Sequence, residues 1–280
     1  MEGKKTGLYE QHLAMGAKMV PFAGFIMPVN YSGIIDEHLA VRKNVGVFDV
    51  SHMGEFEFRG ADARKFLNWI TTNNVAHLEP GGVQYSAMLY ENGGVVDDLL
   101  IYSFDDHYMM VVNASNIDKD FKWIKDHLTG DVQLTDISYQ TTLLAVQGPH
   151  AVDVLRKITN TPLDEISYYH FRAGKVAEID ALISRTGYTG EDGFELYFKR
   201  EFSLHTWEAL FEAGEEFGIK PAGLGARDSL RLEVCYNLYG NDMDQTTNPI
   251  EAGLGWIVKT KKAGGFIGKE QVLKARQITT

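Results

Sequence analysis

The sequence predicts an α+β protein built mainly from antiparallel sheets, in two units of similar build. Stretches typical of helices and strands are interleaved along the chain, but the strands also come in consecutive hairpin runs. Interleaving alone would suit a doubly wound parallel sheet, whereas hairpin runs favour antiparallel pairing. The order of elements at 47–128 is repeated loosely at 132–217, although no residue-level period is visible.

The N-terminal part is predicted to combine helices with short strands. The expected elements are helices at 6–16 and 34–45 and strands at 19–25 and 47–58. Arg42 and Lys43 fall in the last turn of the second helix, where positive charge suits the helix dipole, and Gly46 ends it. In the second half of the second strand, apolar and charged residues alternate, which is typical of a half-buried strand.

The strongest local signal is the dipeptide Asn92-Gly93, which is typical of a hairpin turn whose two central residues need positive φ. Strands are predicted on both sides of it, at 84–90 and 95–102. Two adjacent carboxylates, Asp97 and Asp98, interrupt the apolar run of the second strand. Because side chains alternate across a strand, the two must point to opposite faces. Two arrangements are possible: either both carboxylates lie in water at a strand end, or one of them faces a pocket.

The remaining elements follow one another between glycine- and proline-rich turns. Apolar residues at helical spacing predict helices at 61–71, 116–128, 150–158, 202–217, 226–235 and 269–276. Strands are predicted at 108–113, 132–139, 142–147, 168–171, 176–184, 194–198 and 254–259. The segment 185–193 is rich in glycine and precedes a strand, which is more typical of a hairpin loop than of a phosphate-binding loop.

Composition narrows the possible functions. The 280 residues carry a net charge of −11, so the chain is a poor candidate for binding nucleic acid or an anionic membrane without specificity. The net negative charge does not exclude a small basic pocket that binds an anionic ligand. No run of about 18 apolar residues predicts a membrane-spanning helix, and no apolar signal core follows Met1. We therefore expect a cytoplasmic protein, or a mitochondrial matrix protein if a presequence was removed.

Several catalytic and metal-binding patterns are missing from the sequence. There is no His-Glu-x-x-His pattern, no Gly-x-Ser-x-Gly elbow and no pair of cysteines, so we expect no metal site. The single cysteine, Cys235, excludes an internal disulfide and is expected to pack on a buried helix face.

Two kinds of residue remain as candidates for binding. Arg227 follows a glycine-rich turn and can bind a carboxylate with its two-pronged guanidinium, or form a salt bridge with Asp228 or Glu233. Aromatic side chains at strand or loop ends can stack on a planar heterocycle or belong to the core or its rim. These are Tyr85, Tyr168, Tyr169, Tyr188 and Trp256.

Five stretches, taken together in order and spacing, resemble one known family. They are FDVSHMGE at 48–55, NGGVVDDL at 92–99, SRTGYTGEDGFE at 184–195, GLGARDSLRLE at 223–233 and FIGKE at 266–270. The chain closely resembles the T-protein of the glycine cleavage system, the folate-dependent aminomethyltransferase, from Leu8 to its end. Members of this family take the aminomethyl group held on the lipoyl arm of the H-protein. They release ammonia and pass the methylene to tetrahydrofolate.

The resemblance also implies an architecture. It implies two interleaved α+β units around a central folate cavity, which we expect to comprise 1–50 with 138–218 and 51–137 with 219–280. Members usually continue into a C-terminal β-barrel domain, which we expect to be absent because the chain stops at Thr280.

Residue by residue, the family pattern makes Asp98 the catalytic carboxylate. It implies that Glu195 binds the pterin edge of folate and that Arg227 holds its glutamate part. Further positions expected to line the cavity are Met53, Tyr85, Asn113, Tyr168 and Tyr188. A carboxylate beside N5 of the folate can orient it, stabilise developing positive charge and take its proton. We expect Asp98 to face the cavity in step with Val96 and Leu100, and Asp97 to face away.

Two other functions fit the same fold. One is a folate-dependent demethylase, or the folate domain of a sarcosine or dimethylglycine oxidase; the absence of a flavin-binding fingerprint counts against a complete oxidase. The other is a non-catalytic folate-binding paralogue used in iron–sulfur maintenance. That group carries a cysteine in the late glycine-rich motif, where this chain has none at 265–269.

Overall fold

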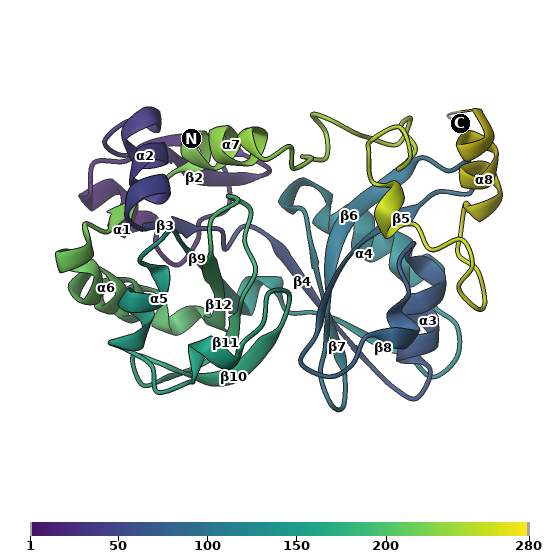
Figure 1. Cartoon of the computed structure of the whole chain (residues 1–280), viewed down its shortest axis with the longest axis horizontal. Coiled ribbons are helices and arrows are strands. Elements are labelled where there is room, and N and C mark those ends of the chain that lie inside the picture. Colours follow the sequence, from purple (N-terminus) through teal and green to yellow (C-terminus); the bar gives the residue numbers. More distant parts are fainter. Residues whose placement is uncertain (1, 279–280) are drawn as a thin grey trace. The chain divides into compact units, whose positions relative to one another are not determined.

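The computed structural model describes residues 2–278, which divide into two compact units. The first unit comprises residues 2–52 and Ser138–Tyr236, and the second comprises Met53–Ile137 and residues 237–278. Each unit combines helices with a sheet whose strands are mainly antiparallel (Figure 1). The predicted α+β class is therefore confirmed.

The first unit is built on a six-stranded sheet in the order β10-β11-β12-β9-β3-β13. Its strands are β3 (Gly46–Asp49), β9 (Thr141–Gln147), β10 (Phe171–Val176), β11 (Ile179–Ser184), β12 (Gly193–Lys199) and β13 (Lys220–Pro221). A separate hairpin joins β1 (Lys18–Phe22) to β2 (Phe25–Asn30). The helices are α1 (Tyr9–Ala14), α2 (Ile34–Lys43), α5 (Ala151–Arg156), α6 (Ser203–Gly214) and α7 (Leu224–Glu233).

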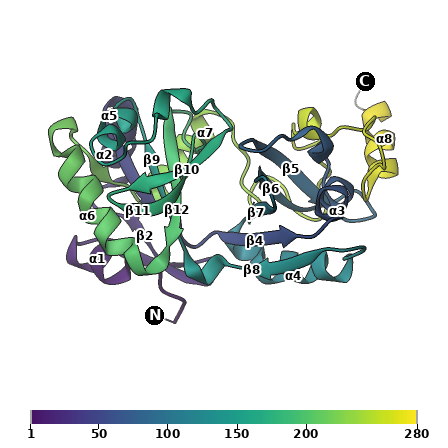
Figure 2. The same ribbon diagram turned by 90° about the horizontal axis from the view of Figure 1, so that it is seen from below.

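The core of the first unit lies between its sheet and the helices α5 and α6 (Figure 2). Alternate residues of β9 and β12, such as Leu144 and Phe194, meet Val154 of α5 and Trp207 of α6 in one buried cluster. Burial of these side chains is the main favourable contribution to the stability of this unit.

The second unit is built on a five-stranded antiparallel sheet in the order β5-β6-β7-β4-β8. Its strands are β4 (Gly54–Arg59), β5 (Val83–Leu89), β6 (Val95–Ser103), β7 (Tyr108–Val112) and β8 (Gln133–Asp136). The helices α3 (Ala63–Ile70) and α4 (Ile117–Asp126) pack on this sheet, and α8 (Lys269–Ile278) ends the described chain (Figure 2). A second cluster joins Leu89 and Val95 of the hairpin to Leu254 and Val272 of the C-terminal segment.

The expected boundary at residue 219 is wrong, because the chain stays in the first unit until Tyr236. Strand β13 pairs in parallel with β3, with Lys220 opposite Gly46. Helix α7 then lies against α2, where His38 Nδ1 is 2.7 Å from Ser229 Oγ. A two-residue strand leaves no periodic pattern in the sequence, so this return to the first sheet could not be read from it.

Other local expectations also differ from the structure. Residues 254–259 contain a 3₁₀ turn, η7 (Gly255–Ile257), in place of a strand. The strand expected from residue 168 begins only at Phe171, because Tyr169 has a φ of 59°. Helix α7 ends before Cys235, which is exposed and has a φ of 58°, so the expected buried packing of Cys235 is wrong.

Within residues 2–278, no helix is both long and apolar enough to cross a membrane.

Candidate functional site

The β5–β6 hairpin carries the two aspartates. Its turn differs from the expected form, because of the two central residues only Gly93 has a positive φ, of 86°. The backbone closes between Tyr90 N and Gly94 O at 2.9 Å, and Asn92 Oδ1 accepts the N–H of Gly94 at 3.0 Å. The hairpin was predicted, but its turn is longer than two residues.

A β-bulge directly before the aspartates decides which way they point. Leu89 pairs with Val95 and Met88 pairs with Asp97, so Val96 is an extra residue on its strand. Val96 packs in the same core cluster as Leu99 and Ile101. The expectation that Asp98 lies in step with Val96 is therefore wrong, because the bulge resets the alternation there.

Asp98 is partly exposed, on the face opposite to that core. Its Oδ2 accepts the hydroxyl of Tyr85 at 2.8 Å, and its Oδ1 accepts Nδ2 of Asn113 at 2.9 Å. Burial, and then the charge of Asp97, raise the pKa of Asp98 to about 7, although both hydrogen bonds act in the opposite direction. A carboxyl group with this pKa can take up or release a proton near neutral pH.

Asp97 is not a solvated strand end, because its side chain is fully buried. Its oxygens accept the backbone N–H and Nδ2 of Asn113, both at 2.9 Å, and Nδ2 of Asn116 at 2.6 Å. Burial is the main reason that its pKa is raised well above the ordinary value. The pair thus divides into one interior acid and one acid that can reach a ligand.

Arg227 of α7 is a cation of the first unit that has no ion partner among the described residues. The two acids expected to pair with it have other partners, since Asp228 binds Arg231 at 2.8 Å and Glu233 binds Arg42 at 2.8 Å. Its guanidinium carbon lies 4.4 Å from the centre of the Tyr188 ring. Burial lowers the pKa of Arg227, which reflects the cost of keeping its charge out of water.

Glu195 lies in the middle of β12 and is 8% exposed. Its Oε2 accepts the hydroxyl of Thr186 at 2.5 Å. Burial raises its pKa, while this hydrogen bond and the charge of Arg227 act in the opposite direction. Glu195 is therefore a carboxyl group in a nearly dry setting, where a hydrogen bond to a ligand is stronger than in water.

The glycine-rich loop before β12 is held by Gln147, whose side chain is fully buried. Its Oε1 accepts the hydroxyl of Thr189 at 2.9 Å, and its Nε2 donates to the carbonyl of Thr186 at 3.1 Å. A Cβ atom on Gly187 would lie 2.0 Å from Gln147 Oε1. Glycine is therefore needed here for close packing, so this stretch serves as the structured loop that the sequence favoured.

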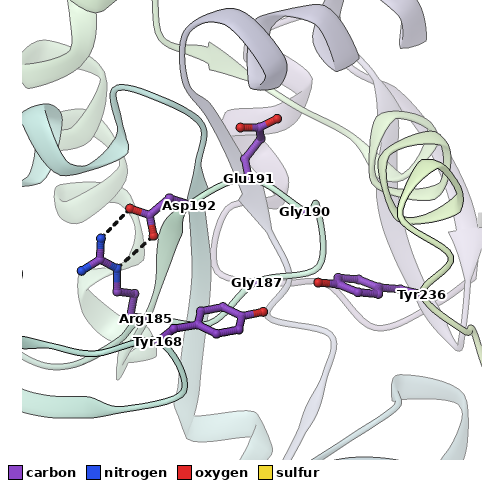
Figure 3. A pocket seen from close by; sticks show the side chains of 7 residues that line it. All are labelled: Tyr168, Arg185, Gly187, Gly190, Glu191, Asp192 and Tyr236. Carbon is purple, nitrogen blue, oxygen red and sulfur yellow. Dashed lines mark hydrogen bonds and ion pairs between the residues drawn. The ribbon is translucent and has the colours of Figure 1, made fainter. Parts of the chain in front are cut away.

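A pocket of about 330 Å³ opens beside this loop (Figure 3). The hydroxyl groups of Tyr168 and Tyr236 point toward each other at one side of it, and Tyr236 stacks on Tyr188 at 5.8 Å. Arg185 binds Asp192 through two hydrogen bonds of 2.9 and 2.6 Å, so this pocket offers aromatic surface and hydroxyl groups more than free charge. Its lining residues are Tyr168, Arg185, Gly187, Gly190, Glu191, Asp192 and Tyr236.

Each unit thus gathers part of the expected site. The second unit brings together Tyr85, Asp98 and Asn113, and Met53 is its first residue. The first unit brings together Glu195, Arg227 and Tyr188, with Tyr168 in the neighbouring pocket.

Some residues of interest were not singled out from the sequence. His52 is 2% exposed, and its Nδ1 has no hydrogen-bond partner among the described residues. Burial, and then the charge of Arg227, lower its pKa to about 3, so its ring is neutral at pH 7. Asn116 and Asp120, which lie near Asp97, were also missed, because nothing in a helical pattern marks a polar residue that faces the core.

Comparisons with known proteins identify the family of this chain. The family model of the GCVT N-terminal domain matches residues 8–262. An aminomethyltransferase of Chloroherpeton thalassium is 56% identical over 275 residues, which is 98% of this chain and 76% of the relative. An aminomethyltransferase of Bacteroides fragilis is 54% identical with the same coverage. The solved glycine cleavage system aminomethyltransferase T from Bartonella henselae superposes with a TM-score of 0.91 at 36% identity, covering 98% of this chain and 75% of its own. The chain belongs to the GCVT N-terminal domain family.

Proposed function

We propose that this chain is an aminomethyltransferase of the glycine cleavage system. It takes the aminomethyl group carried on the lipoyl arm of the H-protein, releases ammonia and passes the methylene to tetrahydrofolate. Curated relatives that cover 98% of the chain carry the name aminomethyltransferase. The observation that carries the proposal for this chain is Asp98, a partly exposed carboxyl group with a pKa of about 7 between two hydrogen-bond donors.

Asp98 is assigned the proton-transfer role. Tetrahydrofolate supplies the nucleophilic N5 that accepts the methylene. As N5 forms its new bond it becomes positively charged, and a carboxylate beside it stabilises that charge and takes the proton. Tyr85 and Asn113 each hold one oxygen of Asp98 and so fix the direction of its lone pairs.

Glu195 and Arg227 are assigned to folate binding. The pterin edge carries N–H groups, which a carboxylate such as Glu195 accepts. The glutamate part of folate is an anion, which a guanidinium can bind. Among the described residues, no acid forms an ion pair with the guanidinium of Arg227. Tyr188, which lies under that guanidinium, and Tyr168 and Tyr236 beside it offer flat aromatic surface.

The test uses the full chain with aminomethyl-lipoyl H-protein and tetrahydrofolate, and measures 5,10-methylenetetrahydrofolate. Asp98→Asn should abolish product formation, while the circular dichroism spectrum stays that of the wild type. Asp118→Asn is the matched control, because it makes the same change at an exposed position of the same unit. Normal turnover by Asp98→Asn would overturn the role of Asp98.

A second measurement separates the other functions. Saturable quenching of tryptophan fluorescence by folate without aminomethyl transfer would favour a folate-binding paralogue or a demethylase. The absence of any saturable signal would overturn every folate-based function.

A further inference from the structure

Asp120 is a buried carboxyl group that the proposed reaction does not use. Its side chain on α4 is 0% exposed, whereas Asp118 on the same helix is exposed. Lys119 Nζ lies 3.0 Å from its Oδ1 as an ion partner, and among the described residues no other donor reaches either oxygen. A buried carboxylate with so few donors is costly to keep ionised.

Asp120 lies within hydrogen-bond reach of a second carboxyl group, that of Asp97. Asp97 is also 0% exposed, and its oxygens already accept three N–H groups from Asn113 and Asn116. Two ionised carboxylates offer only acceptors and repel each other, so this contact becomes a hydrogen bond only if one of them keeps a proton. Burial raises the pKa of both groups, that of Asp120 to about 6 and that of Asp97 well above its ordinary value.

The amide of Asn113 joins this acid pair to Asp98. Its Nδ2 donates to Oδ1 of Asp97 and to Oδ1 of Asp98, each at 2.9 Å. The number of protons on the pair therefore sets the charge directly beside Asp98. One proton leaves a single negative charge, which lies against Lys119, whereas a fully ionised pair would add a second negative charge next to Asp98.

We propose that Asp97 and Asp120 share one proton at neutral pH, and that Asp120 acts through this pair as a positioning residue that sets the charge state of Asp98. The shared proton rests on the burial of both carboxyl groups, their contact with each other and the few donors around Asp120, and only its consequence for turnover rests on the proposed function. Other ionisable groups face the pair. Lys119 contacts both Asp120 and the backbone of Val96, and its Nζ lies 4.8 Å from the ring of Tyr239. The pKa of Tyr239 is raised by its burial and by the charges of Asp97 and Asp120, among others. Asp98, which is hydrogen-bonded to Tyr85, is the neighbour of Asp97 in the chain and interacts with its charge.

The first test detects the proton itself and needs no substrate. A protonated carboxyl group absorbs in the infrared separately from a carboxylate. Because Asp98, with a pKa of about 7, would itself contribute to this band at pH 7, the spectra are recorded at pH 8, where Asp98 is mostly ionised. There we expect the full chain to show the band and Asp97→Asn to lose it. Asp120→Asn should lose it as well, because the amide introduced at that position would donate to Asp97 and let Asp97 ionise. The control Asp118→Asn should retain the band. Absence of the band from the wild type, or its survival in Asp97→Asn, would overturn the shared proton.

The second test follows the charge beside Asp98 through the pH profile of aminomethyl transfer. In Asp120→Asn, the negative charge of the pair would lie wholly on Asp97, which shares the Asn113 amide with Asp98, instead of being divided between Asp97 and Asp120. The pKa of Asp98 should therefore rise by about one unit, because a like charge disfavours ionisation. The pH at which kcat rises should increase by the same amount, with a loss of about fivefold in kcat at pH 7 and little change in KM for tetrahydrofolate. An unchanged pH profile of kcat, or a loss confined to KM, would overturn the positioning role.

These outcomes separate the inference from the proposed function. If the wild type transfers no aminomethyl group, the proposed function fails, and the infrared band still decides whether the proton is shared. If the wild type is active but lacks the band, the inference alone fails. Should Asp120→Asn not fold, the comparison of the wild type with Asp97→Asn still decides the question.

Discussion

Nδ2 of Asn113, the residue between β7 and the helical turn that follows it, donates to Oδ1 of Asp98 on β6 at 2.9 Å. The same amide also binds Asp97, so a single side chain orients both acids of the hairpin. Its position directly after a buried strand makes this orientation rigid, because the whole of β7 is buried.

Removing that amide should slow the proposed reaction. In Asn113→Ala, Asp98 keeps only Tyr85 as a side-chain donor, and Asp97 loses one of its donors. Because a well-placed general base contributes on the order of 10²–10⁴ in rate, losing part of its orientation should cost about tenfold to a hundredfold in kcat. Steady-state kinetics with tetrahydrofolate as the varied substrate checks this. An equal rise in KM with unchanged kcat would show that Asn113 only binds substrate.

The rate of aminomethyl transfer should depend on pH through Asp98. The pKa of this group is raised to about 7, so most of it is protonated at pH 6 and ionised at pH 8. A base acts only in its ionised form, so kcat should rise with pH through about 7 and then level off. The profile of Tyr85→Phe should be displaced to higher pH, because the lost hydrogen bond favoured the ionised form. Identical pH profiles of the wild type and Tyr85→Phe would show that another group controls the rise of kcat with pH.

Replacing Arg227 should weaken binding of folate more than it affects turnover. Lysine retains the charge but not the two-pronged geometry, so Arg227→Lys should raise the Kd for folate by about tenfold, in line with about 1–2 kcal/mol for a charge-assisted pair. Fluorescence titration measures this directly. Arg172→Lys is the matched control, since Arg172 is an exposed arginine of the same unit that pairs with Glu165 at 2.8 Å. Equal effects of the two substitutions would point to a general charge effect.

The glycine-rich loop offers a test of packing that does not depend on activity. A Cβ atom at position 187 would lie 2.0 Å from Gln147 Oε1. Gly187→Ala should therefore lower the free energy of unfolding by about 1–3 kcal/mol, the usual cost of overpacking. Urea denaturation of Gly187→Ala, Gln147→Ala and the double variant checks this, because the double variant should recover part of the loss. Strict additivity would contradict the contact.

Asp49 should govern part of the acid stability of the first unit. Burial opposes its ionisation, but hydrogen bonds from His12, Ser51 and Thr6 lower its pKa to about 2. Since the folded-state pKa lies below the unfolded value, the ionised group stabilises the fold above about pH 4, and this is lost as the pH falls toward 2. The contribution is about 2 kcal/mol. Denaturation between pH 2 and 6 should show this slope in the wild type and lack it in Asp49→Asn.

Much of the fold and the hairpin could be predicted because those signals are local. Alternation along β6 places Asp97 and Asp98 on opposite faces, as expected. The bulge at Val96 was not predictable, because it depends on the register with β5, which a single strand does not encode. Nor could the sequence decide the pairing of Arg227. Its acidic neighbours are taken by Arg231 and Arg42, and Arg42 lies far away in the chain.

The cluster that joins the hairpin to the C-terminal segment has a consequence for how the protein is made. Leu89 and Val95 flank the turn before Asp98, and they are covered by residues such as Leu254 and Val272, which leave the ribosome far later. During synthesis, the hairpin therefore has an apolar surface exposed to water until the segment 254–272 emerges. A nascent chain arrested before residue 243 contains every residue assigned to the proposed site. It still lacks the apolar residues that cover the hairpin. This part of the second unit can therefore form its core only after residues 254–272 have been made.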